Sequence, residues 1–158
     1  GCALQMGAWI GGASDTDAHK LYEFGVLLGT AFQIQDDYLD AFGDPESFGK
    51  QLGGDIIENK KTILYHQAMA KGNDKQKEKL LYWFSSPSVA PKKTEKIQEV
   101  KALFEDTGSR IASVELVKKF TEKAFEKIDE LVVSSEGKEL FKELKMTKRP
   151  LQLCWQDR

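Results

Sequence analysis

Residues 14–42 read SDTDAHKLYEFGVLLGTAFQIQDDYLDAF, and this stretch decides the fold class. Ser14 followed three residues later by Asp17 forms a start similar to a capping box. A helix that begins at Asp15 can continue to about Phe42, a length of roughly 40 Å at about 1.5 Å per residue. Because apolar side chains occupy most of its circumference, we predict a central, buried helix. These side chains are Leu21, Tyr22, Phe24, Val26, Leu27, Leu28, Phe32, Ile34 and Leu39.

The chain before this helix begins abruptly. Residues 1–10 are apolar and rich in small side chains, and no N-cap residue precedes them. We therefore expect that this segment is the later part of a helix and that upstream chain is missing. Gly11 and Gly12 are expected to end the helix.

The chain after the long helix alternates loops with further helical patterns. Residues 43–54 form a loop that contains four glycines and Pro45. Helices are expected over about 55–72 and 74–84, with a surface loop over 85–91. Apolar stripes then predict two outer amphipathic helices, the first ended by Gly108. We predict a single all-α domain over residues 1–158, with an irregular tail over 145–158.

Composition and charge exclude several classes of protein. The 158 residues are 41% hydrophobic and 30% charged, as expected for a soluble folded domain. A net charge of −2 provides no basic field for nucleic acid or for an anionic membrane. The most apolar stretch, 24–34, is too short for a membrane span. Cys2 and Cys154 have no spacing typical of a disulfide framework or zinc site, so we expect a reducing, cytoplasmic location.

Three aspartates near the end of the long helix share one face. Gln33, Asp36, Asp37 and Asp40 project within about 100° of arc, at roughly 100° per residue. Like charges at close range repel, and isolated buried carboxylates would become protonated. A multivalent cation resolves this repulsion, and Mg²⁺ commonly bridges one or two carboxylates to substrate phosphates. The alternative is a solvated acidic stripe near a helix end.

Positive charges follow the aspartates, in and after the glycine-rich loop. Such a loop can bring backbone N–H groups and cations towards an anion. An acidic and then a basic segment is the arrangement of a metal–diphosphate site. A nucleotide-binding Walker A motif is not indicated, because Asp44 and Gln51 occupy positions that need Gly and Ser or Thr. The residues that indicate such a site are Lys50, Asp55, Lys60 and Lys61.

Residues 32–62, FQIQDDYLDAFGDPESFGKQLGGDIIENKKT, resemble the second aspartate-rich region of the trans-polyprenyl diphosphate synthases, such as geranyl and farnesyl diphosphate synthases. The helical pattern from residue 1 to about 144 is also similar to the carboxy-terminal half of that family. The resemblance implies an isoprenoid synthase helical bundle whose amino-terminal helices are missing, and it implies a homodimer.

The resemblance implies catalytic roles for five charged residues of this region. Asp36 and Asp40 match the carboxylates that hold Mg²⁺ against the allylic diphosphate, and Asp37 supports them. Lys50 and Lys60 match the lysines that contact the diphosphate. These five residues are therefore the predicted catalytic set.

The remaining matched positions concern substrate binding. Asp55 matches the loop aspartate that helps to position the lysines, whereas Lys61 has no counterpart. Phe32 and Gln33 match residues that face the isopentenyl substrate. The implied reaction is condensation of an allylic diphosphate with isopentenyl diphosphate, in which Mg²⁺ and lysines stabilise the departing diphosphate.

The sequence also departs from the family. Members carry an earlier aspartate-rich motif, basic residues for isopentenyl diphosphate, and a Lys-Thr pair just upstream of the position that matches residue 1. None of these upstream features is present in this sequence. About half an active site is therefore expected, with little activity alone and self-association into dimers or larger assemblies. Two alternatives stay open. One is a terpene cyclase of the same architecture, and the other is a non-catalytic subunit or interaction module.

Overall fold

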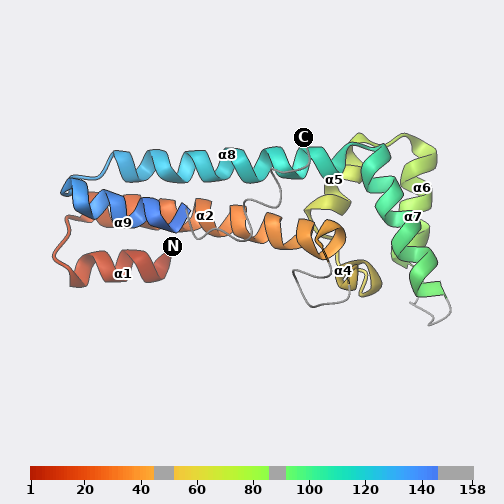
Figure 1. Ribbon diagram of the computed structural model, residues 1–158, viewed down its shortest axis with the longest axis horizontal. Coiled ribbons are helices and arrows are strands. Elements are labelled where there is room, and N and C mark those ends of the chain that lie inside the picture. Colours follow the sequence, from red (N-terminus) through yellow and green to blue (C-terminus); the bar gives the residue numbers. More distant parts are fainter. Residues whose placement is uncertain (45–51, 86–91, 146–158) are drawn as a thin grey trace. The chain divides into compact units, whose positions relative to one another are not determined.

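The computed structural model describes residues 1–44, 52–85 and 92–145, and the elements within these ranges are α-helices (Figure 1). The all-α prediction is confirmed. The chain divides into two compact units, Gly1–Gln33 with Leu116–Arg158, and Ile34–Glu115. Lys50, the loop from 86 to 91 and the tail from 146, with Cys154, lie outside the described residues. Within the described ranges, none of the helices combines the length and the hydropathy needed to cross a bilayer.

The long helix α2 spans Asp15–Phe42, as predicted. Its start is held by Ser14, whose hydroxyl accepts the Asp17 N–H at 3.1 Å and donates to the Asp17 carboxylate at 3.0 Å. Its burial differs from the prediction. One face, which includes Phe24 and Tyr38, is buried, but Val26 and Phe32 are 45% and 62% exposed.

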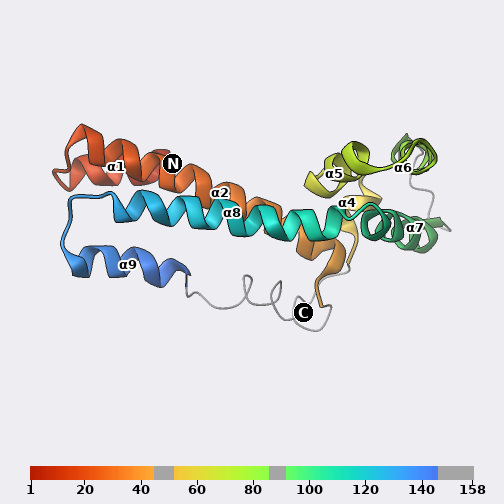
Figure 2. The same cartoon turned by 90° about the horizontal axis from the view of Figure 1, so that it is seen from above.

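The first unit packs around the amino-terminal part of α2. It contains α1 (Cys2–Ile10), the carboxy-terminal part of α8 (Ser109–Asp129) and α9 (Ser135–Lys145). In Figure 2, α1 and α9 lie on opposite sides of α8. The Phe24 ring makes edge contacts with Phe125 and Phe141, both at 5.7 Å between ring centroids. The buried cluster of this unit is Leu21, Phe24, Ala124, Phe125, Ile128 and Leu131.

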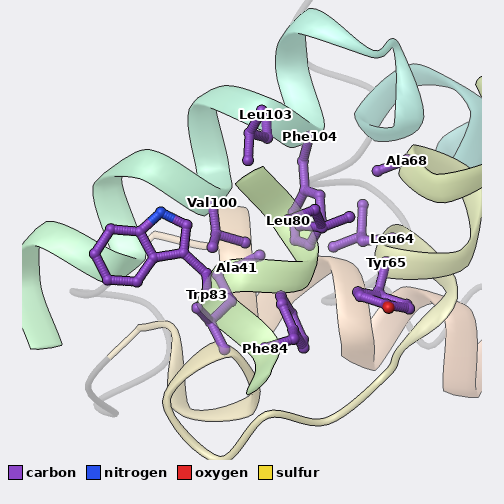
Figure 3. Close-up of a cluster of buried hydrophobic side chains, with 11 residues drawn as sticks. Ala41, Leu64, Tyr65, Ala68, Leu80, Trp83, Phe84, Val100, Leu103 and Phe104 are labelled. Carbon is purple, nitrogen blue, oxygen red and sulfur yellow. The ribbon is translucent and has the colours of Figure 1, made fainter. Parts of the chain in front are cut away.

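The second unit is built from short helices that follow the end of α2. They are α4 (Gly54–Ile57), α5 (Ile63–Lys71), α6 (Asp74–Ser85) and α7 (Lys93–Asp106). Their apolar faces meet in one cluster, where the Tyr65 and Phe84 rings lie 4.6 Å apart (Figure 3). The cluster consists of Ala41, Ile56, Leu64, Tyr65, Ala68, Leu80, Trp83, Phe84, Val100, Leu103 and Phe104.

The helix predicted over about 55–72 is wrong as a single element. It is divided into α4 and α5, because Asn59 has a φ of 59° and so leaves the right-handed helical region. Asparagine tolerates this left-handed conformation better than other side chains do. As a consequence, Lys60 directly follows the turn at Asn59 and lies in the non-helical segment between α4 and α5.

Candidate functional site

The aspartates of α2 differ in how much solvent they meet. Asp36 is exposed, whereas Asp37 and Asp40 are partly buried. Phe32 and Gln33, one turn earlier on the same helix, are both exposed. Asp36 is exposed to solvent, and it makes no hydrogen bond or ion pair with the described residues.

Asp40 is bonded to the start of α4. Its Oδ2 accepts the backbone N–H of Asp55 at 2.9 Å, and its carbonyl oxygen accepts the N–H of Gly53 at 2.7 Å. The other carboxylate oxygen lies so close to Gly54 that a Cβ on that residue would be 3.2 Å away. These contacts bring α4 against the aspartate-bearing end of α2.

Burial raises the pKa of the Asp40 carboxyl, and the negative charge of Asp55 also raises it. The backbone N–H groups of Asp55 and Gly54 and the Lys60 ammonium oppose the rise without cancelling it. The N–H groups and Lys60 therefore only partly stabilise the negative charge of Asp40, and a bound cation would stabilise it further.

Asp37 joins α2 to the next helix, α5. Its Oδ2 accepts the N–H of Ile63 at 3.3 Å, at the first residue of α5. The N-cap residue Thr62 makes no side-chain capping bond there. Asp37 therefore caps a helix that follows it by 26 residues, and an acidic group at this end is electrostatically favourable.

Lys60 lies between these two attachments. Its ammonium contacts the carboxylates of Asp55 at 2.8 Å and of Glu58 at 2.9 Å. The bonds to Asp55 and Glu58 raise the pKa of Lys60, so its positive charge persists throughout the neutral range. Lys61 instead lies over the Tyr65 ring, 5.8 Å from the centroid, and is not bonded to the carboxylates.

The aspartates of this site provide some, but not all, of the oxygen ligands that a hard cation such as Mg²⁺ needs. Among the described residues, no three His, Cys, Asp or Glu side chains converge as a ready-made metal site. Asp36 and Asp40 lie one helical turn apart, and both offer oxygen atoms. Mg²⁺ usually takes only one or two protein carboxylates and completes its shell with water and substrate phosphates. These two residues therefore fit Mg²⁺ held together with a diphosphate.

Two residues near the site, Lys96 and Asn59, were not predicted from the sequence. Lys96 of α7 is buried and donates a hydrogen bond to the side-chain oxygen of Asn59. The available signal was position, because Lys96 precedes Val100 and Leu103 by four and seven residues in the apolar stripe of its helix. A lysine in such a stripe indicates a buried partner.

Comparisons with known proteins agree with the resemblance. A family model described as polyprenyl synthetase matches residues 1–106. A short chain isoprenyl diphosphate synthase of Methanothermobacter thermautotrophicus is 42% identical over 79 residues, which are 50% of this chain and 24% of that protein. A geranylgeranyl diphosphate synthase of Saccharolobus solfataricus is 31% identical over 138 residues, which are 87% of this chain and 40% of that protein.

A solved structure gives the same result for the fold. The crystal structure of a geranylgeranyl pyrophosphate synthase superposes with a TM-score of 0.83 at 40% identity, and the match covers 98% of this chain and 46% of that one. The chain thus spans less than half the length of each of these three proteins. The family model covers most of the chain, and the chain belongs to the polyprenyl synthetase family.

Proposed function

We propose that this chain supplies the diphosphate-binding carboxylates and lysines of a Mg²⁺-dependent prenyltransferase. The substrates would be an allylic diphosphate and isopentenyl diphosphate. The observation that carries the proposal is the double attachment of the acidic α2 face to the segment that bears Lys60. Asp40 bonds the start of α4, and Asp37 bonds the start of α5. A cation and a lysine could therefore meet the same diphosphate group.

Each side chain has a distinct task in this reaction. The allylic carbon–oxygen bond breaks, and its electron pair leaves with the diphosphate. Lys60, and Lys50 by its match to the family motif, stabilise the charge that develops on the departing oxygen atoms. The double bond of isopentenyl diphosphate then attacks the allylic cation, a carbon–carbon bond forms, and a proton is lost to restore a double bond.

The other predicted residues would hold the metal ion, position Lys60 or contact the isopentenyl substrate. Asp36 and Asp40 would hold Mg²⁺, which supplies charge neutralisation on the diphosphate when bound. Asp37 maintains the α5 attachment, and Asp55 orients Lys60 through the 2.8 Å contact. Phe32 and Gln33 are exposed and would contact the isopentenyl substrate.

The other functional classes are less well supported. The match to the polyprenyl synthetase model favours prenyl transfer over the cyclase alternative. The chain covers less than half of each relative. The subunit alternative is therefore compatible with the same proposal, because a partner would then complete the site. Self-association and a cytoplasmic location remain predictions from the sequence.

Calorimetric titration with inorganic diphosphate in the presence of Mg²⁺ tests the assignment. We expect Asp36→Asn and Lys60→Met each to weaken binding by about tenfold or more, the usual effect of losing a charged group that contacts an anion or its metal. Asp106→Asn is the matched control, because Asp106 is exposed at the end of α7, and it should leave the affinity unchanged. Equal affinities for Asp36→Asn, Lys60→Met and the control would contradict the proposed site.

A further inference from the structure

Lys96 is a buried lysine outside the predicted site. Only 3% of its surface is exposed, and its ammonium donates to the Asn59 carboxamide and lies 5.6 Å from the Phe84 ring centroid. Lysine is almost never fully buried unless it is paired, because removing an ammonium from water is unfavourable. Burial accordingly lowers the pKa of Lys96. A group held under these conditions requires a structural or functional reason.

The partner of Lys96 stands at the turn that ends α4. Asn59 has a φ of 59°, and its N–H donates to the Ile56 carbonyl at 3.2 Å. The helix before this turn has only four residues, Gly54–Ile57. Such a short helix cannot be stable alone, because nucleation of a helical turn is unfavourable. The geometry of the turn must therefore be fixed by contacts from elsewhere in the unit.

Two neighbouring residues of α7 provide such contacts at both ends of α4. Lys96 bonds Asn59 after its last turn. Ile97 packs against Gly53 just before its first residue, so closely that a Cβ on Gly53 would lie 2.8 Å from Ile97 Cγ1. α4 and α7 also pack directly against each other. α7 therefore holds α4 at its start and at its end.

The turn at Asn59 in turn determines where Lys60 lies. The Lys60 N–H donates to the Asp55 carbonyl at 2.9 Å, and its ammonium contacts the Asp55 carboxylate at 2.8 Å. Both bonds depend on the left-handed conformation of Asn59, which directs the next residue back towards Asp55. We propose that Lys96 is a positioning residue, whose bond to Asn59 fixes the turn that presents the Lys60 ammonium to the diphosphate. This inference rests on the proposed role of Lys60.

Diphosphate titration in Mg²⁺ tests the inference on the full chain. Lys96→Met keeps most of the aliphatic stem and removes the ammonium, and Asn59→Gly removes the carboxamide while glycine readily adopts the positive φ. We expect each to weaken diphosphate binding by about tenfold, which is typical for residues that orient a ligand-binding group. Lys93→Met, an exposed lysine on the same helix, is the matched control and should bind like the wild type.

A second background separates positioning from general stability. In a Lys60→Met chain, Lys96→Met should cause no further loss of diphosphate affinity. Any change in the free energy of unfolding that Lys96→Met causes in the wild type should remain in this chain, as measured by urea unfolding. A further loss of affinity in that background would overturn the inference, because Lys96 would then act by another route. Should Lys96→Met fold poorly, Asn59→Gly gives the same comparison.

The outcomes also distinguish the inference from the proposed function. If Lys60→Met weakens diphosphate binding while Lys96→Met and Asn59→Gly do not, the positioning role is refuted and the proposed site stands. If Lys60→Met itself leaves the affinity unchanged, the proposed role of Lys60 fails, and the positioning role of Lys96 fails with it.

Discussion

Substituting Gly53 with alanine is the most direct test of how α4 is held. Gly53 has a φ of 81°, a conformation in which an L side chain is strained. An added Cβ would also lie 2.8, 3.0 and 3.1 Å from three carbon atoms of Ile97. The shortest of these is about 0.7 Å below the roughly 3.5 Å at which carbon atoms normally meet. Gly53→Ala therefore combines backbone strain with overpacking.

The two contributions can be separated within the same unit. Gly108 has a φ of 69°, but a Cβ there would meet no atom within 4 Å among the described residues. Gly108→Ala should therefore show the backbone contribution alone, about 1–2 kcal/mol. Gly53→Ala should add the contribution of overpacking, about 1–3 kcal/mol. We expect a total loss of about 2–5 kcal/mol for Gly53→Ala.

Urea unfolding followed by circular dichroism measures both losses. Ile97→Ala removes the atoms that the new Cβ would meet, so Gly53→Ala should be less destabilising in an Ile97→Ala chain than in the wild type. Equal losses for Gly53→Ala and Gly108→Ala, with no change in the Ile97→Ala background, would refute the argument that α7 packs directly on the start of α4.

Three further predictions concern pH, assembly and activity. Because burial lowers the pKa of Lys96 in the folded state, the folded chain loses this proton before the unfolded chain does, and stability should rise with pH up to the usual lysine range. Lys96→Met should lack this rise when urea unfolding is compared from neutral to alkaline pH. Exposed Trp9, Val26 and Phe32 predict self-association, so light scattering at micromolar concentration should give at least twice 17.8 kDa, and a stable monomer would contradict this. The isolated chain should condense dimethylallyl and isopentenyl diphosphates negligibly in a radiolabel assay, because much of the substrate positioning is expected from residues outside this sequence.

Local sequence signals predicted much of the fold. Ser14 and Asp17 indicated the start of α2, and their hydrogen bonds are present. Gly108 was expected to end the helix before it, and its φ of 69° agrees with that role. These predictions succeed because a helix start or end is specified by a few neighbouring residues. The division between α4 and α5 was not predicted, because Asn59 is held by Lys96, which is 37 residues away in the sequence.

The candidate site was predicted as a set of residues but not as a geometry. Helical periodicity places Asp36, Asp37 and Asp40 on one face, yet it gives no indication of which backbone they contact. The structure gives Asp37 and Asp40 each a backbone N–H partner 26 and 15 residues further along the chain. Such partners depend on how the chain folds back after the glycine-rich loop, and that path is not encoded in a local pattern.

In the proposed site, Asp40 has two tasks with different chemical requirements, support of α4 and binding of Mg²⁺, whereas Asp37 supports α5. Supporting the start of α4 or α5 needs only an oxygen atom that accepts an N–H, and a neutral amide can provide one. Holding Mg²⁺ needs the negative charge as well. At Asp40, an asparagine can keep the bond from the Asp55 N–H, but it loses the second acceptor oxygen that faces the Gly54 N–H and it weakens the cation site. An alanine removes all of these contacts. Asp36 has no such bond among the described residues, so in the proposed site its removal should report most directly on metal-dependent diphosphate binding.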